Sequence, residues 1–172
     1  MQFKPIPEPP ASLDGLAAVR DALPREPDPD ADCCARVIER TTVETRDAAA
    51  DWITFCRALE LAAVEADGYR RGAPKTASAE GGTLDPDCLA GAFRDRIRGA
   101  DAVLRALERA NEPVVPETLF AHLDAADEIP ASERRRHGDE FPAVWTDRVE
   151  RILEWAVLFD AVEPVDDGYR PA

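Results

Sequence analysis

The chain has 172 residues, of which 45% are hydrophobic and 33% are charged, and its formal net charge at pH 7 is −14. This apolar content supports a packed core and excludes an intrinsically disordered chain. The length fits one large domain or two small ones. No apolar run approaches the roughly 18 residues of a membrane-spanning helix, so no contact with a membrane is expected.

Proline is frequent at the start of the chain, and residues 1–11 predict a proline-rich arm. Met1-Gln2-Phe3-Lys4 leads straight into these prolines without the apolar segment of a signal peptide, which predicts a cytoplasmic location. Ser12 is a suitable N-cap for a first helix that ends before Pro24. A second helix is expected from Cys33 to about Arg40.

A third helix is expected next, because apolar residues recur from Trp52 to Leu59 at the spacing of one helix face. The pattern then changes period at Ala63-Val64-Glu65, and Asp67-Gly68 precedes Tyr69-Arg70-Arg71. Asp-Gly between two short β-like runs predicts a hairpin whose two central turn residues take positive φ. Three helices closed by a hairpin is the element order of a winged helix.

The residues at 72–83 are small and polar and predict a linker at 72–84, so two units are expected at 12–71 and 85–172. Asp85 followed by Pro86 predicts the start of a helix. This helix is expected to be long and to bend or break at Gly99.

The last part of the chain contains a helix opened by Pro116 and a polar segment from about Asp127 to Phe141 that is expected to be a loop. This loop carries the one concentrated basic run, Arg134-Arg135-Arg136-His137. A final helix follows, with Trp145 and Val149 on its apolar side.

The end of the second unit repeats the end of the first, which indicates a duplicated plan. The second copy is interpreted as longer at the helix end and at the tip of the hairpin. The matched pieces are Leu59–Ala62 with Leu153–Ala156, Ala63–Glu65 with Ala161–Glu163, and Asp67–Arg70 with Asp167–Arg170.

These features resemble the tandem winged helix-turn-helix modules of archaeal transcription regulators, over residues 12–71 and 85–170. The chain also resembles small uncharacterised haloarchaeal proteins that end in Gly-Tyr-Arg. The fold class implied is mainly α, with small β-hairpin wings and two winged-helix-like units in tandem. The segment 127–141 departs from the pattern, because it is too long for a tight helix-turn-helix turn.

The resemblance implies a transcription-associated protein that binds double-stranded DNA, with the third helix of a unit in the major groove and the wing on the backbone. The alternative is that these faces are solvated and joined by pairs such as Asp147 with Arg151. The candidate contact residues for DNA or a partner are Thr54, Arg57, Arg70, Arg71, Arg134, Arg135, Arg136, Arg148, Arg151 and Arg170.

The charge composition bears on this expectation. Acidic residues number 35 against 21 basic ones, and Lys4 and Lys75 are the only lysines. This resembles proteins of salt-loving archaea, although an acidic protein of an ordinary GC-rich organism also fits. Net negative charge opposes phosphate binding, and molar salt weakens phosphate contacts further, so a DNA-binding protein here must rely on base and shape contacts.

A second function also fits, an adaptor that binds a protein partner or a second copy without binding DNA. Trp155, Leu158 and Phe159 lie off the main apolar stripe of the last helix and favour such a contact. The four cysteines and two histidines lack metal-site spacing. No phosphate loop, catalytic motif or small-molecule site is evident, so neither a cofactor nor an enzyme activity is expected.

Overall fold

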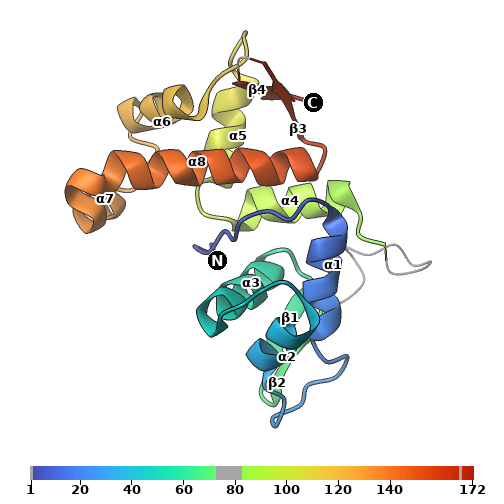
Figure 1. The fold of residues 1–172 in the computed structure, drawn as a ribbon. Coiled ribbons are helices and arrows are strands. Elements are labelled where there is room, and N and C mark those ends of the chain that lie inside the picture. The colour runs from blue at the N-terminus through green and yellow to red at the C-terminus, as the bar shows by residue number, and fades with distance from the viewer. Residues whose placement is uncertain (1, 73–82, 167) are drawn as a thin grey trace. The chain divides into compact units, whose positions relative to one another are not determined.

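The computed structural model describes residues 2–72, 83–166 and 168–172 (Figure 1). The chain divides into two compact units, Met1–Ile97 and Arg98–Ala172. The sequence placed the division at 72–84, of which residues 73–82 lie outside the described part. The helix that follows this segment packs within the first unit. There the ring of Phe93 contacts the ring of Phe55 edge to face, with 6.2 Å between the ring centroids.

The first unit has the winged-helix order of three helices and a hairpin, followed by a fourth helix. Side chains of the N-cap residues Ser12, Asp32 and Thr45 accept hydrogen bonds from the first turns of the three helices, which fixes where each begins. The elements are α1 (Leu13–Ala22), α2 (Cys33–Arg40), α3 (Arg46–Ala58), β1 (Ala62–Glu65), β2 (Gly68–Arg71) and α4 (Pro86–Arg96).

The amino-terminal arm is docked on this unit. Phe3 is buried, and its main-chain N–H donates to the carbonyl oxygen of Arg96 at 2.8 Å. The guanidinium groups of Arg57 and Arg96 lie 5.6 and 5.3 Å from the centroid of the Phe3 ring. Ile6 is also buried. The proline-rich segment therefore belongs to the packed structure of the first unit.

The second unit has the same order of three helices and a hairpin, with one helical segment inserted before its last helix. Its elements are α5 (Ala100–Glu108), α6 (Pro116–Ala125), α7 (Ala131–His137), the 3-10 helix η2 (Gly138–Glu140), α8 (Phe141–Leu158), β3 (Val162–Val165) and β4 (Gly168–Pro171).

Two expectations for this region are settled by the local structure. The long helix expected after Asp85 is broken at Gly99, whose φ of 87° places it in the left-handed region. The expected loop at 127–141 was wrong, because most of it is helical. The seventh helix, α7, carries the basic run, and buried Glu133 on its inner face forms an ion pair with Arg98.

The two hairpins have the same length and register. Val64 pairs with Tyr69 in the first, and Pro164 pairs with Tyr169 in the second. Counterparts therefore lie 100 positions apart throughout, so the interpretation of a longer second wing was wrong. The same holds at the helix ends, where Glu60 and Asp160 both take positive φ, 62° and 56°.

The turn of the first hairpin also differs from the prediction. Its two residues are Ala66 and Asp67, and Gly68 opens β2 with a φ of 122°. Glycine is required there and at Gly168, because a neighbouring chain segment passes close by. A Cβ atom on Gly168 would lie 2.6 Å from the carbonyl oxygen of Val114. Val114 forms an antiparallel bridge with Tyr169, which adds a third strand segment to the second wing.

Among the described helices, none combines the length and the apolar character needed to cross a membrane. Within the described ranges, no cluster of His, Cys, Asp and Glu side chains is arranged to bind a metal ion.

Candidate nucleic-acid interface

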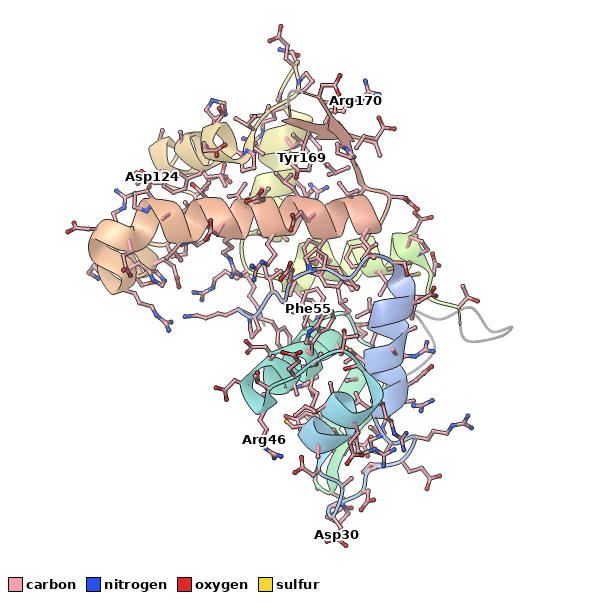
Figure 2. All side chains as sticks on the ribbon, in the orientation of Figure 1. Asp30, Arg46, Phe55, Asp124, Tyr169 and Arg170 are labelled. Carbon is pink, nitrogen blue, oxygen red and sulfur yellow. The ribbon has the colours of Figure 1, made fainter. Side chains whose placement is uncertain are left out.

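The outer face of α3 carries acidic side chains. Asp47 and Asp51 are exposed, with the small Ala50 between them, and Thr54 is half-buried. Arg46 stands at the start of this face (Figure 2) and donates to both carboxylate oxygens of Asp32, at 2.9 and 3.1 Å. The hydrogen bond from Arg46, supported by the main-chain N–H of Ala35, lowers the pKa of Asp32. This face is therefore negative where phosphates would approach.

The candidate arginines of the first unit hold its parts together. Arg57 covers the ring of Phe3. Arg70 pairs with Glu65 across the hairpin. Arg71 donates from Nε to the carbonyl oxygen of Leu23 at 2.9 Å and also donates to the carbonyl of Asp21.

Burial lowers the pKa of Arg71, with the Asp21 carboxylate opposing that shift. Together, Arg57, Arg70 and Arg71 bind an aromatic ring, a carboxylate and main-chain carbonyl groups. They do not form a continuous positive strip along the first unit.

On α8 the candidate arginines divide between two faces. Arg148 is turned inward and donates to the carbonyl oxygen of Arg98 at 3.1 and 2.7 Å. Burial lowers the pKa of Arg148 to about 10. Arg151 is exposed beside Glu150, and Asp147 is exposed on the same helix. The outer face of this helix therefore carries mixed charge.

The positive charge on the wing of the second unit is also neutralised by a neighbouring carboxylate. Arg170, labelled in Figure 2, donates from Nε and Nη2 to Glu163 Oε2 at 2.9 and 2.7 Å. Tyr169 is half-buried, and burial raises the pKa of its hydroxyl, as do Glu154 and Glu150. Its main chain bonds reciprocally with Val114, at 3.0 Å in each direction. Tyr169 therefore contributes to the sheet of the wing.

The basic helix α7 presents the clearest cationic surface. Arg134 pairs with Asp124 and lies 5.3 Å from the centroid of the Phe141 ring. Arg135 and Arg136 are exposed, and neither forms a hydrogen bond or ion pair with any part of the chain that the structure describes.

The inner face of α7 is fixed by Glu133. The carboxylate of Glu133 accepts from Arg98, and His137 Nε2 lies 3.5 Å from its other oxygen. Sequence reasoning missed Glu133 and Arg98, because an acidic residue in a polar segment carries no signal of burial. The spacing of Glu133 and His137, four positions apart, is the one local hint.

The basic helix α7 stands beside the start of α8. It lies at the amino-terminal end of α8 (Figure 1), the end of a recognition helix that reads base edges in helix-turn-helix proteins. The exposed residues of the first turn of α8, Pro142 and Ala143, carry no charge, and Thr146 is half-buried. Cationic side chains thus stand near a first turn without exposed charge, which the exposed acidic residues Asp139 and Glu140 precede.

The aromatic residues near the end of α8 are buried in this chain. Trp155 and Phe159 are 0% and 1% exposed, and their ring centroids lie 5.5 Å apart. Leu158 is half-buried. The two rings are therefore core residues and do not present a surface to a second chain.

Three helices followed by a two-stranded wing, present twice, define a tandem winged-helix protein. Comparison with known families agrees. The model of the halobacterial double winged helix domain matches residues 1–172, and the chain belongs to this family. No curated protein and no solved structure matches the chain.

Proposed function

We propose that this protein is a DNA-binding, transcription-associated winged-helix protein in which the second unit makes the main contact with DNA. The observation that carries the proposal is the exposed pair Arg135 and Arg136 on α7, near the first turn of α8, whose exposed residues carry no charge. In this arrangement α7 contacts phosphates on either side of the groove, and residues near Thr146 approach the base edges.

The overall negative charge limits how this protein holds DNA. A net charge of −14 repels the duplex at low salt. In molar salt the Debye length falls to about 3 Å, so distant carboxylates no longer oppose binding while close contacts persist. Each phosphate contact adds a slope of about −0.9 to the plot of log affinity against log salt concentration. Two arginines therefore imply a shallow salt dependence.

The test is DNA selection followed by fluorescence anisotropy in molar potassium chloride. Duplexes enriched from a random pool by the wild-type chain are titrated with the double variant Arg135→Glu, Arg136→Glu. We expect this variant to lose affinity by about tenfold or more, because two phosphate contacts become repulsive.

The matched control is the double variant Arg25→Glu, Arg40→Glu, which makes the same change in net charge at exposed arginines of the first unit. We expect the control to retain wild-type affinity. Failure to enrich any duplex, or equal loss in both double variants, would contradict the proposal.

A second function is favoured by a specific observation on the first unit, where exposed Asp47 and Asp51 make α3 unsuited to DNA. We infer that this face binds a protein partner with a basic surface. Crosslinking in native salt with wild-type chain and with the double variant Asp47→Asn, Asp51→Asn tests this. A crosslinked protein lost in this variant and retained in Asp30→Asn, Asp87→Asn supports it, and identical recovery from both variants argues against it.

A further inference from the structure

The outer edge of β1 is an open strand edge. Gly72 N donates to Leu61 O at 2.8 Å, so the main-chain groups of Leu61 point toward β2. Because this direction alternates along a strand, the N–H and C=O groups of Ala63 and Glu65 also point toward β2. The N–H and C=O groups of Val64 therefore point away from β2. No hydrogen bond to these two groups comes from the described residues outside the strand pair.

The second unit blocks the equivalent edge. Pro164 occupies the position that corresponds to Val64, opposite Tyr169 in the same register. Proline has no N–H to donate, and edge strands use it to prevent pairing with another strand. The same hairpin thus occurs twice in this chain. The outer edge of β3 is blocked by proline, whereas the outer edge of β1 can pair with another strand.

The far edges of β2 and β4 are each bonded at one residue to another segment of the chain. Arg71 N donates to Pro24 O at 2.8 Å along the far side of β2. Val114 bonds with Tyr169 along the far side of β4. Among the described strands of both hairpins, β1 is therefore the one whose outer edge has neither a proline nor a hydrogen bond to another described segment of the chain.

The chemistry of this edge fits a strand without net charge. Val64 is 49% exposed, the largest value among the large hydrophobic residues that the structure describes. Two of the acidic residues near it are balanced, because Glu65 pairs with Arg70 and Glu60 pairs with Arg96 at 3.1 Å, whereas Asp67 in the turn is exposed and has no ion pair among the described residues. An approaching strand centred on Val64 thus meets apolar side chains and the Glu65–Arg70 ion pair.

We propose that β1 pairs with β1 of a second copy of this chain, antiparallel about a two-fold axis at Val64. Each Val64 then donates one main-chain hydrogen bond to the other and accepts one, and the two exposed side chains come into contact. In this register Glu65 lies opposite Ala63 of the other copy, so no like charges face each other directly.

The blocked second wing determines the size of the assembly. A chain with one open edge forms a closed two-fold dimer, because the same surface is used by both copies and no edge is left over. With two open edges, chains would continue to pair. Pro164 therefore limits the assembly to a dimer. Net charge opposes the approach of two copies, so the dimer strengthens as salt is added.

Sedimentation equilibrium of the full chain in molar potassium chloride tests the proposal. We expect a monomer–dimer equilibrium, and we expect Val64→Lys to raise the dissociation constant of the dimer by about tenfold or more. The matched control is Val115→Lys, which changes the other exposed valine, 39% exposed, and is expected to leave the equilibrium unchanged.

Two proline exchanges make the test specific to the strand edge. Val64→Pro copies the blocked edge and should yield a monomer, whereas Pro164→Val opens a second edge and should yield assemblies larger than a dimer. If Val64→Pro does not fold, Val64→Lys decides. A wild-type chain that stays monomeric into the millimolar range, or a dimer unaffected by Val64→Lys, would overturn the proposal.

Discussion

The guanidinium of Arg148 donates two hydrogen bonds, of 3.1 and 2.7 Å, to the main-chain carbonyl oxygen of Arg98. Arg98 in turn pairs through its own guanidinium with Glu133 on α7. The main chain and the side chain of Arg98 thus connect α8 with α7. This connection fixes the basic helix relative to the helix start that it flanks.

Arg148 is predicted to contribute to stability and not to DNA affinity. Its replacement by methionine leaves the carbonyl of Arg98 without a donor, and we expect a loss of about 2 kcal/mol in the free energy of unfolding. Arg135→Met is the converse control, since an exposed residue without a partner in the described chain changes stability by about 0.5 kcal/mol or less. Denaturant unfolding and DNA titration of both variants check this, and the reverse pattern would contradict it.

Phe3 is predicted to anchor the amino-terminal arm. Phe3→Ala removes a buried ring that contacts the guanidinium groups of Arg57 and Arg96, and we expect the first unit to lose about 3 kcal/mol. The exposed neighbour Gln2 supplies the control, Gln2→Ala. Thermal unfolding and limited proteolysis of the arm report the change. Equal melting temperatures for the two variants would show that the arm does not contribute to the packing.

Gly168 is predicted to tolerate no side chain. With a φ of 136° and a Cβ position 2.6 Å from Val114 O, Gly168→Ala strains the backbone and displaces the third strand segment of the wing. We expect a loss of more than about 1 kcal/mol. Gly91→Ala, in the interior of α4 where no atom lies within 4 Å of the added Cβ, should instead stabilise by roughly 0.5–1 kcal/mol. Thermal melts that show the same sign for both substitutions would refute this.

Cys56 is predicted to make stability depend on alkaline pH. Burial raises the pKa of its thiol from 9.0 to about 12. Between these values the unfolded chain releases the thiol proton while the folded chain keeps it, so stability falls as pH rises. The slope is at most about 1.4 kcal/mol per pH unit. Denaturant unfolding from pH 8 to 11 should show a shallower decline in Cys56→Ala, and parallel curves would exclude this contribution.

The repeated helix and hairpin could be predicted from the sequence because both signals are local. Apolar spacing around Phe55 marks a helix face, and an Asp-Gly pair marks a tight return of the chain. The one-residue shift of the turn was not predictable from that pair alone. Gly68 opens β2 next to a distant segment, and a Cβ atom on it would lie 3.0 Å from the carbonyl oxygen of Asp28.

The division into units and the helix α7 depend on contacts far apart in sequence. The apolar face of α4 could pack against either neighbour, and only the contact of Phe93 with Phe55 decides. A polar segment such as Ala131–His137 becomes a helix because Glu133 and Arg134 find partners in Arg98 and Asp124. Likewise, the sequence does not distinguish an arginine that binds a main-chain carbonyl group from an arginine that faces solvent.

In the proposed complex, DNA contacts the second unit at α7 and the start of α8. Hydrogen–deuterium exchange of the full chain in molar potassium chloride, with and without a selected duplex, tests it most directly. We predict slower exchange in residues 131–146 on DNA binding and no change in α3. Protection of α3, or no protection anywhere at saturating DNA, would contradict the assignment.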